Sequence, residues 1–337
     1  MPSSLEFTFE AISEDRPGEK WRRAFDRHWH AYSRWFLRSG KNDRPTYLEC
    51  RRAIRKFMPE LMPLYEEVCE AAGGGDLEAR FLSMWCPPAY VGGCSQVILR
   101  GPPVSLLRSY DYSPKLFEGA WFASRYFGKR VVAMVDCLWG VLDGINEDGL
   151  AVSLSFGGRT TIGEGFGIPL VLRYVLEMAE DVQAAIAILT RVPVHMSYSI
   201  AMVDRKGEHA VVYVNPDRPI EITSRSVVTN HQRLPEWKRH AEATRSVERE
   251  QALLQAVSEI NNPEAMPEAM INVFLRAPVL QTAYMKGYGT LYAAHYRPED
   301  ASVELIWPTK RWRQSCADFL EGSLTLDYAA GQRSLGA

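Results

Sequence analysis

One cysteine, Cys94, stands in the sequence pattern best suited to covalent chemistry. It directly follows Gly92 and Gly93 in the stretch GGCSQVILRG, and a strand-like apolar run begins at Val97. A thiol next to a free α-amine is a compact pair of nucleophile and base, because the amine titrates at about pH 8 and accepts the thiol proton through a water molecule. Inside a chain, such an amine arises only when the preceding peptide bond is cut. The pattern therefore leads to the hypothesis that the chain cuts itself before Cys94.

The two glycines suit such a cut. They allow the strained backbone that would expose the Gly93 carbonyl to the Cys94 sulfur. Attack by the sulfur gives a thioester, and water then releases the fragment that ends at Gly93. The alternative is that Cys94 is a small buried hydrophobic residue that begins a strand after a glycine turn.

A charged pair follows on the next strand-like segment, LLRSYDYSP. Arg108 and Asp111 come after a turn at Gly101-Pro102-Pro103, which would bring the chain back antiparallel beside Cys94. We expect Asp111 to hold the new ammonium group, and Arg108 to fix that carboxylate and keep the local potential positive, which favours the thiolate. The alternative is a surface ion pair that stabilises the fold by less than about 1 kcal/mol.

The elements before Cys94 are predicted to be helical up to about residue 90. Between Lys20 and Lys56 the sequence has twelve lysines and arginines but only three acidic residues. Five aromatic residues recur there at spacings of four and three, on one face of a helix: Trp21, Phe25, Trp29, Tyr32 and Phe36. Because they share a face and do not alternate with the cations, we expect them to be buried. The alternative is a basic helix that binds phosphates or nucleic acid.

After Gly93 the pattern changes to strands and hairpins. Strand groups are predicted at 95–101, 104–112, 130–158, 198–215 and 289–307, with helices near 168–180 and 181–192 between them. Strand groups joined by hairpins and separated by helical pairs indicate an α+β sandwich and not a doubly wound parallel sheet. The last 30 residues show little periodicity.

The composition indicates an ordinary globular protein. The 337 residues are 46% hydrophobic and carry a formal net charge of −2, which argues against binding of nucleic acid or an anionic membrane by the whole chain. The first residues show no signal-peptide pattern, and no apolar run approaches the roughly 20 residues of a membrane span. The six cysteines lie far apart, so we expect a reduced, cytoplasmic protein. No metal or phosphate motif is present, GEGFG at 163–167 is too short for a dinucleotide site, and we expect no cofactor.

Four motifs in order give the sequence a resemblance to a known group. GGCSQ, RSYD, DGINEDGLAVSLSFGG and VVTNHQRLPEW resemble the cysteine N-terminal-nucleophile (Ntn) hydrolases. The nearest branch is similar to the isopenicillin N or acyl-coenzyme A:6-aminopenicillanic acid acyltransferase-like peptidases, with the choloylglycine hydrolases as distant relatives. The resemblance covers roughly residues 85–310 and implies a four-layer αββα sandwich.

The resemblance also implies roles for individual residues. Cys94 matches the self-cleaving nucleophile, and Arg108 and Asp111 match the Arg and Asp that follow it. Asn230 matches the asparagine that helps to bind the oxyanion, where each preorganised donor stabilises a tetrahedral intermediate by about 2.7–4 kcal/mol. Arg245 resembles the arginine at a helix start that completes the site, although it could equally belong to a solvated helix face.

Two features of the sequence bear on the substrate and on the leader. A second asparagine of the family site is replaced by Ser155 or Phe156, whereas Asn146 is expected to shape a turn. The walls of the substrate pocket are expected among Tyr112, Trp139, Phe156 and Phe166, and core packing is the alternative for each of them. Residues 1–93 would form a helical leader that stays bound after cleavage, and 94–337 the catalytic domain.

Three functions remain open at this point. The first is a self-activated cysteine hydrolase of a small N-acyl or aminoacyl amide. The second is an acyl-coenzyme A-dependent N-acyltransferase on the same fold. The third is a non-catalytic binding protein that uses its basic leader, in particular Arg22, Arg23, Arg51 and Arg52. The sequence leaves open whether the protein forms a homo-oligomer.

Overall fold

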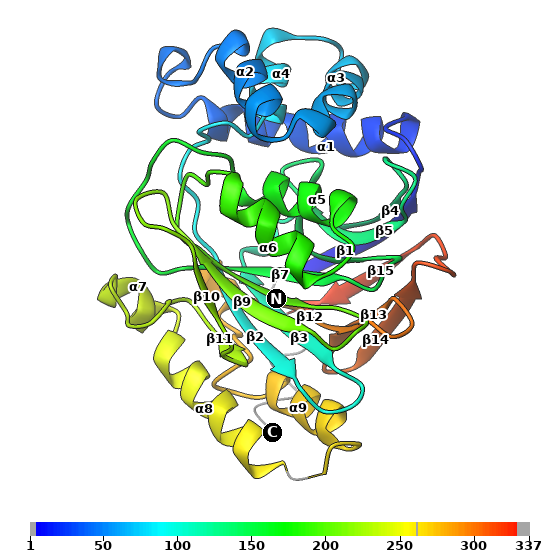
Figure 1. The fold of residues 1–337 in the computed structure, drawn as a ribbon, viewed down its shortest axis with the longest axis vertical. Helices are drawn as coiled ribbons and strands as arrows, with labels where there is room; N and C mark the ends of the chain where they lie inside the picture. Colours follow the sequence, from blue (N-terminus) through cyan, green and yellow to red (C-terminus); the bar gives the residue numbers. More distant parts are fainter. Residues whose placement is uncertain (1–4, 261, 329–337) are drawn as a thin grey trace.

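The computed structural model describes residues 5–260 and 262–328 and contains two β-sheets (Figure 1). The nine-stranded sheet has the order β10 (Glu221–Thr223), β9 (His209–Val214), β8 (Tyr198–Val203), β7 (Ala151–Phe156), β6 (Gly140–Asn146), β5 (Val131–Asp136), β4 (Ala120–Ser124), β1 (Glu6–Ser13) and β15 (Gly322–Asp327). The six-stranded sheet has the order β11 (Val227–Val228), β2 (Gly93–Leu99), β3 (Ser105–Tyr112), β12 (Gly289–Arg297), β13 (Ser302–Trp307) and β14 (Lys310–Ser315).

The two sheets pack face to face, and helices cover their outer faces. β2 lies against β7 and β8, which joins the sheets. α5 (Ile168–Met178) and α6 (Val182–Arg191) pack on the nine-stranded sheet, whereas α8 (Ser246–Glu259) and α9 (Met266–Phe274) pack on the six-stranded one (Figure 1). A short helix, α7 (Lys238–Ala243), precedes α8. The predicted α+β class with two sheets is therefore confirmed.

Strands β2 and β3 are buried on both faces, because one face meets the other sheet and the other meets α8 and α9. Along β2, Val97 and Leu99 belong to the apolar cluster beneath α8 and α9, whereas Cys94 and Ile98 belong to the cluster between the sheets. This alternation follows from the two-residue period of a strand. It places the thiol of Cys94 between the sheets.

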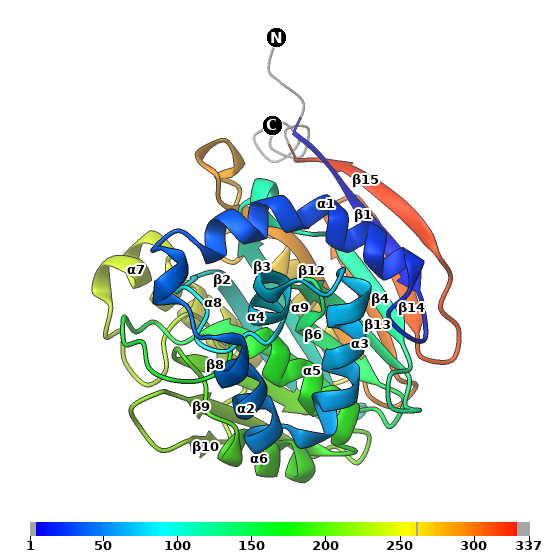
Figure 2. The same ribbon diagram turned by 90° about the horizontal axis from the view of Figure 1, so that it is seen from above.

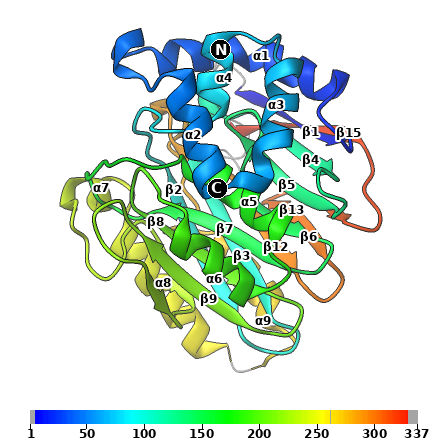
Figure 3. The same cartoon turned by 45° about the horizontal axis from the view of Figure 1, so that its top comes forward.

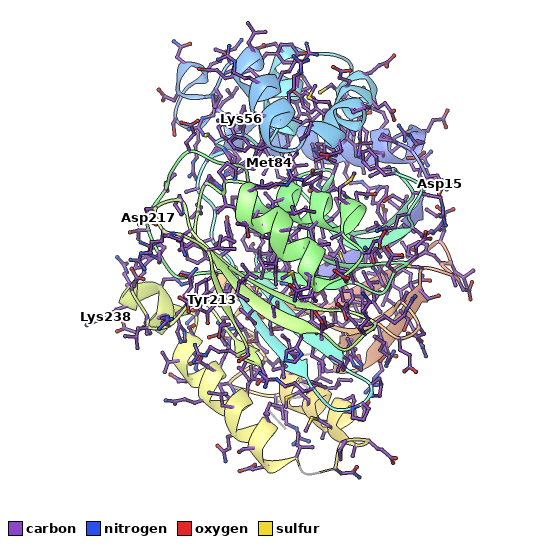
Figure 4. All side chains as sticks on the ribbon, in the orientation of Figure 1. Asp15, Lys56, Met84, Tyr213, Asp217 and Lys238 are labelled. Carbon is purple, nitrogen blue, oxygen red and sulfur yellow. The ribbon has the colours of Figure 1, made fainter. Side chains whose placement is uncertain are left out.

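The N-terminal segment forms a helical cap over the molecule (Figures 1 and 2). It consists of α1 (Glu19–Phe36), α2 (Tyr47–Phe57), α3 (Met62–Ala71) and α4 (Asp76–Leu82). The aromatic stripe of α1 faces inward as predicted: Trp21, Phe25 and Phe36 are each 1% exposed, and Trp29 and Tyr32 pack against the core. Figure 4 shows side chains filling the boundary with α5 around Met84, whose carbonyl accepts a hydrogen bond from Gly167.

The prediction that residues 1 to about 90 are helical was wrong at its beginning. Residues 6–13 form β1, which pairs antiparallel with β15 and parallel with β4 (Figure 3). β14 and β15 also give the end of the chain more regular structure than its sequence indicated. These strands are stabilised by partners that lie far away in the sequence, which a local pattern does not reveal. Across the described residues, no helix is both long and apolar enough to cross a membrane.

Candidate active site

Cys94 lies near the start of β2, opposite Tyr110 of β3. Its side chain is 1% exposed, and Nη2 of Arg108 lies 3.1 Å from Sγ. Burial raises the pKa of the Cys94 thiol to about 11, against the opposing effect of the positive charge on Arg108. In the intact chain the thiol is therefore protonated, and the guanidinium is already placed to stabilise a thiolate.

The partner of Arg108 differs from the predicted one. Its Nη1 pairs with Asp143 of β6, whose two carboxylate oxygens also accept hydrogen bonds from the hydroxyls of Tyr292 and Tyr296. Arg108 and Asp111 are three residues apart on a strand, so their side chains point to opposite faces of the sheet. The expectation that Arg108 fixes the Asp111 carboxylate is therefore wrong. The carboxylate that pairs with Arg108 is that of Asp143.

Asp111 lies on the α8 face of β3, directly opposite Gly93 in the strand register. One carboxylate oxygen accepts a 2.7 Å hydrogen bond from the hydroxyl of Thr290, and the other is 3.4 Å from Nη1 of Arg249. Burial raises the pKa of Asp111, while Arg249 opposes the shift. The carboxyl group thus stands beside the peptide bond that joins Gly93 to Cys94.

Asn230 holds the backbone of Cys94 from the other side. Its Oδ1 accepts a 3.0 Å hydrogen bond from the Cys94 backbone N–H. Its Nδ2 is 3.4 Å from the carbonyl oxygens of Gly92 and Phe156. The Asn230 backbone N–H in turn donates to the hydroxyl of Ser246, at the start of α8. The resemblance pointed to this residue, and the structure brings it to Cys94.

Arg249, and not Arg245, completes this cluster. The Arg249 guanidinium is fully buried and donates to the Cys94 carbonyl (2.6 Å), the Ser95 hydroxyl (2.8 Å) and Asn230 Oδ1 (2.5 Å). Arg245 precedes α8 with a positive φ of 53°, and its exposed side chain pairs with Glu248. The prediction for Arg245 is thus corrected. Arg249, about one helical turn later, is the arginine in the first turn of α8 that faces inward and contacts Cys94.

Tyr288 is a neighbour of the site that the sequence did not point to. A methyl group added at Gly93 would lie 1.9 Å from the Tyr288 hydroxyl oxygen and 3.0 Å from Cβ of Asp111. That hydroxyl is buried and has no hydrogen-bond partner within the described part of the chain. Burial, together with the nearby Asp111, raises the pKa of Tyr288, so the phenol is a neutral donor. No residue spacing links position 288 to Cys94, because the two meet only through the pairing of β12 with β3.

The four predicted pocket residues have different surroundings. Tyr112 lines a cavity at the end of β3. Trp139 and Phe166 are buried in the core, where the Trp139 indole donates to the Leu82 carbonyl and Phe166 packs edge to face on Trp85. Phe156 is also buried and packs on His240, 4.9 Å between ring centroids. Core packing therefore accounts for Trp139, Phe156 and Phe166, and their prediction as pocket walls is corrected.

The other two polar positions have structural partners. Ser155 donates to the Thr229 carbonyl and so supports the segment before Asn230. Asn146 holds the turn after β6: its Oδ1 accepts from the Leu150 N–H, and its Nδ2 donates to the carbonyls of Leu176 and Ala179. The expected role of Asn146 in a turn is confirmed. Within the described residues, no group of three or more histidine, cysteine or acidic side chains is placed to hold a metal ion.

Comparison with solved structures returns several hydrolases of low sequence identity. A mutant of the conjugated bile acid hydrolase from Clostridium perfringens is 11% identical with a TM-score of 0.49, over 70% of this chain and 97% of that one. The N-acylethanolamine-hydrolyzing acid amidase ortholog of Caenorhabditis elegans is 14% identical with a TM-score of 0.46, over 69% and 99%. Penicillin V acylase from Agrobacterium tumefaciens is 14% identical with a TM-score of 0.44, over 70% and 83%.

Comparison at the level of sequence families is more decisive. No curated protein matches the sequence significantly. The family model described as acyl-coenzyme A:6-aminopenicillanic acid acyl-transferase matches residues 100–312, which include Arg108, Asp111, Asn230 and Arg249 and begin six residues after Cys94. Because this match spans more than half of the chain, the protein belongs to the acyl-coenzyme A:6-aminopenicillanic acid acyl-transferase family, as the sequence motifs predicted.

Proposed function

We propose that the chain cuts itself between Gly93 and Cys94 and that the product is a cysteine amidohydrolase of the Ntn type. The observation that carries this proposal is that Cys94 is held at both of its reacting groups. Its backbone N–H is bonded to Asn230 Oδ1, and its Sγ faces the Arg108 guanidinium. A structural cysteine at the start of a strand needs an acceptor for its N–H but no guanidinium group at its sulfur. The observed helix–sheet–sheet–helix layering is consistent with the αββα fold of that class.

Self-cleavage follows from these contacts in two steps. The Cys94 sulfur attacks the Gly93 carbonyl carbon, the C–N bond breaks, and the thiol proton passes to the Cys94 nitrogen, which gives a thioester and a free amine. Water then adds to the thioester and releases the Gly93 carboxylate and the thiol. The Tyr288 phenol and the Asp111 carboxyl group, which flank Gly93, are the groups best placed to exchange protons and stabilise charge there.

The same groups then serve the external substrate. The new amine of Cys94 keeps Asn230 Oδ1 as its acceptor and takes the thiol proton as the sulfur attacks the substrate amide. The amine next protonates the leaving nitrogen, and water hydrolyses the thioester. Asn230 Nδ2, which contacts the Gly92 carbonyl in the intact chain, becomes available to the oxyanion once that carbonyl moves away.

We further propose that residues 1–93 remain bound to residues 94–337 after the cut. β1 lies in the nine-stranded sheet between β4 and β15, so its hydrogen bonds do not depend on the bond at Gly93. Tyr32 of α1 bonds to the side chains of Glu118 and Asp136, and the Trp21 indole donates to the Leu138 carbonyl. These contacts join the leader to the catalytic domain along α1.

Trapping of an acyl-enzyme tests this function directly. The cleaved protein is mixed with simple N-acyl anilides and quenched in acid within the first turnover, and its intact mass is measured. We expect the mass of the acyl group on the 94–337 chain, at Cys94 in peptide mapping, and its loss in water. Faster loss with an added amine, or acylation from acyl-coenzyme A, would identify the acyltransferase alternative. An acyl group on another residue, or none with any amide that is turned over, would refute the proposal.

Substitution of Gly93 by alanine is expected to slow self-cleavage at least tenfold. The added methyl group would lie 1.9 Å from the Tyr288 hydroxyl, so the peptide bond or the phenol must move. Gly92→Ala is the matched control, because a methyl group there meets no atom closer than 3.7 Å. The cut fraction is followed by denaturing electrophoresis during cell-free synthesis. Equal rates for both variants would argue against a tightly held scissile bond.

A further inference from the structure

A cavity of about 300 Å³ lies between α1 and the end of β3, and one of its lining residues, Tyr112, directly follows Asp111 in the chain. Aromatic side chains line much of it, among them Trp35 of α1, Tyr90 of the leader end, and Tyr112 and Phe117 of the catalytic domain. Glu118 and Asp136 also line it, together with Tyr32. The cavity is thus apolar along its walls, with two acidic groups in its lining.

The backbone before Cys94 leads from the sulfur to this cavity. A methyl group at Gly92 would touch the rings of Tyr110 and Tyr112, at 3.8 and 3.7 Å, and Tyr110 is the strand partner of Cys94. Tyr90, two residues earlier, already lines the cavity. The segment from Tyr90 to Gly93 is the acyl side of the bond that is cut. Because a substrate presents its own acyl group to the same sulfur, that group follows the same path.

The two acids in the cavity leave one carboxylate oxygen without a hydrogen-bond donor among the described residues. Oε1 of Glu118 accepts from the Tyr32 hydroxyl at 2.5 Å and from the Leu138 N–H at 2.9 Å. Asp136 Oδ1 also lies 2.9 Å from the Tyr32 hydroxyl, which has a single hydrogen to donate. Glu118 is only 6% exposed, and its Oε2 has no hydrogen-bond partner among the described residues. An unpaired buried carboxylate oxygen is costly unless a cation or a proton satisfies it.

The burial of the pair also shifts its pKa values. Burial raises the pKa of Glu118, and burial together with the charge of Glu118 raises the pKa of Asp136. The empty pair therefore retains a proton more readily than exposed acids do. Two basic side chains also line the cavity, the half-buried His28 and the exposed Lys115, and burial lowers the pKa of His28. Within the described part of the chain, neither is hydrogen-bonded or ion-paired to the acids, so a bound ammonium group would meet net negative charge at Glu118 and Asp136.

We propose that this cavity is the acyl subsite and that it selects acyl groups bearing a primary amine, whose ammonium group binds Glu118 Oε2 and Asp136. The inference rests on the proposed function, because it takes Cys94 as the group that is acylated. The ammonium supplies the missing donors, and the faces of the aromatic rings attract a cation. A purely structural role of Glu118 would explain why its Oε1 accepts a hydrogen bond from the Leu138 N–H. It would not explain why Oε2 is buried without a hydrogen-bond partner among the described residues.

A matched pair of substrates tests the subsite. 3-Aminopropanoyl and butanoyl p-nitroanilide differ only in an ammonium group in place of a methyl group. We expect kcat/KM of the cleaved wild-type protein to be at least tenfold higher for the amino compound. Glu118→Gln and Asp136→Asn are each expected to reduce this ratio at least tenfold. If the acids only supported the fold, both rates would fall together and the ratio would stay unchanged.

A control variant separates loss of charge from loss of stability. Glu177 is another buried glutamate with an unpaired oxygen, but it pairs with Arg173 on α5, and Glu177→Gln is expected to leave the substrate ratio at its wild-type value. A wild-type ratio near one, or a ratio that survives Glu118→Gln, would overturn the subsite.

Binding provides a test that does not depend on turnover. Calorimetric titration with propylamine is expected to show binding to the cleaved wild-type protein and at least tenfold weaker binding to Glu118→Gln. If no anilide is hydrolysed, the proposed function fails, whereas the titration still decides whether the cavity binds amines. Equal affinity of the two proteins, or no binding to either, would overturn the subsite by itself.

Discussion

Replacement of Cys94 by alanine is expected to yield one uncut chain of 38.2 kDa without amidase activity. The sulfur is the proposed nucleophile in both self-cleavage and turnover, so its loss removes both reactions together. We expect the rate of turnover to fall at least about 10⁴-fold, as it does when a covalent nucleophile is deleted from an enzyme. Intact-mass analysis measures the cut, and release of p-nitroaniline measures the activity.

Two controls make this result specific. Cys316→Ala removes another buried thiol, one that contacts the carbonyl oxygens of Arg130, just before β5, and of Ile145 on β6, and is expected to be cut normally. Cys94→Ser retains a weaker nucleophile in the same place and is expected to be cut slowly. If Cys94→Ala were still cut at Gly93, the scission would be the work of another protease, and the proposed mechanism would be wrong.

Replacement of Arg249 by lysine is expected to lower the rates of self-cleavage and turnover at least about 100-fold, which corresponds to about 2.7 kcal/mol. The guanidinium donates to the Cys94 carbonyl, the Ser95 hydroxyl and Asn230 Oδ1, and it lies 3.4 Å from Asp111. A lysine retains the charge but not the fixed fork of donors. Rates are measured on protein whose circular dichroism and unfolding midpoint are compared with those of the wild type.

Arg245→Ala is the matched control for this prediction. Its side chain is 45% exposed and, among the described residues, pairs with Glu248 three residues on, an arrangement that contributes less than about 1 kcal/mol. We therefore expect rates within about twofold of wild type. A large loss with Arg245→Ala and none with Arg249→Lys would contradict the arrangement of the site described above.

The local features of the site could be predicted because they depend on one hairpin. The glycines before Cys94, the turn at 101–103 and the apolar runs beside them were sufficient to place β3 antiparallel to β2, with Arg108 near the sulfur. The pairing of Arg108 with Asp111 was wrong, although the odd spacing along a strand already indicated opposite faces.

The distant contributions could not be predicted in the same way. Arg245 and Arg249 lie on the same stretch of helix-forming sequence, and only the docking of α8 on β2 determines which of them faces Cys94. Tyr288 depends on the pairing of β12 with β3, and the partner of Arg108, Asp143, depends on the packing of the two sheets. These contacts connect residues that are 35 or more positions from their partners, and a single sequence carries no periodic signal for them.

The leader shows the same division between local and distant information. The aromatic stripe of α1 follows from helical spacing, and its burial was predicted correctly. β1 and β15 were missed, because each is a short strand whose partner lies at the other end of the chain. The pairing of Tyr32 with Glu118 and Asp136 likewise unites three segments that no motif connects.

The N-terminal residue of the large fragment decides whether the chain is cut before Cys94. Purified wild-type protein is digested without prior reduction or labelling, and its peptides are read by tandem mass spectrometry. The account predicts a peptide that begins at Cys94 with a free α-amine, together with a second chain that ends at Gly93 and co-purifies with the first. A peptide that runs unbroken through Gly92, Gly93 and Cys94 in fully active protein would contradict it.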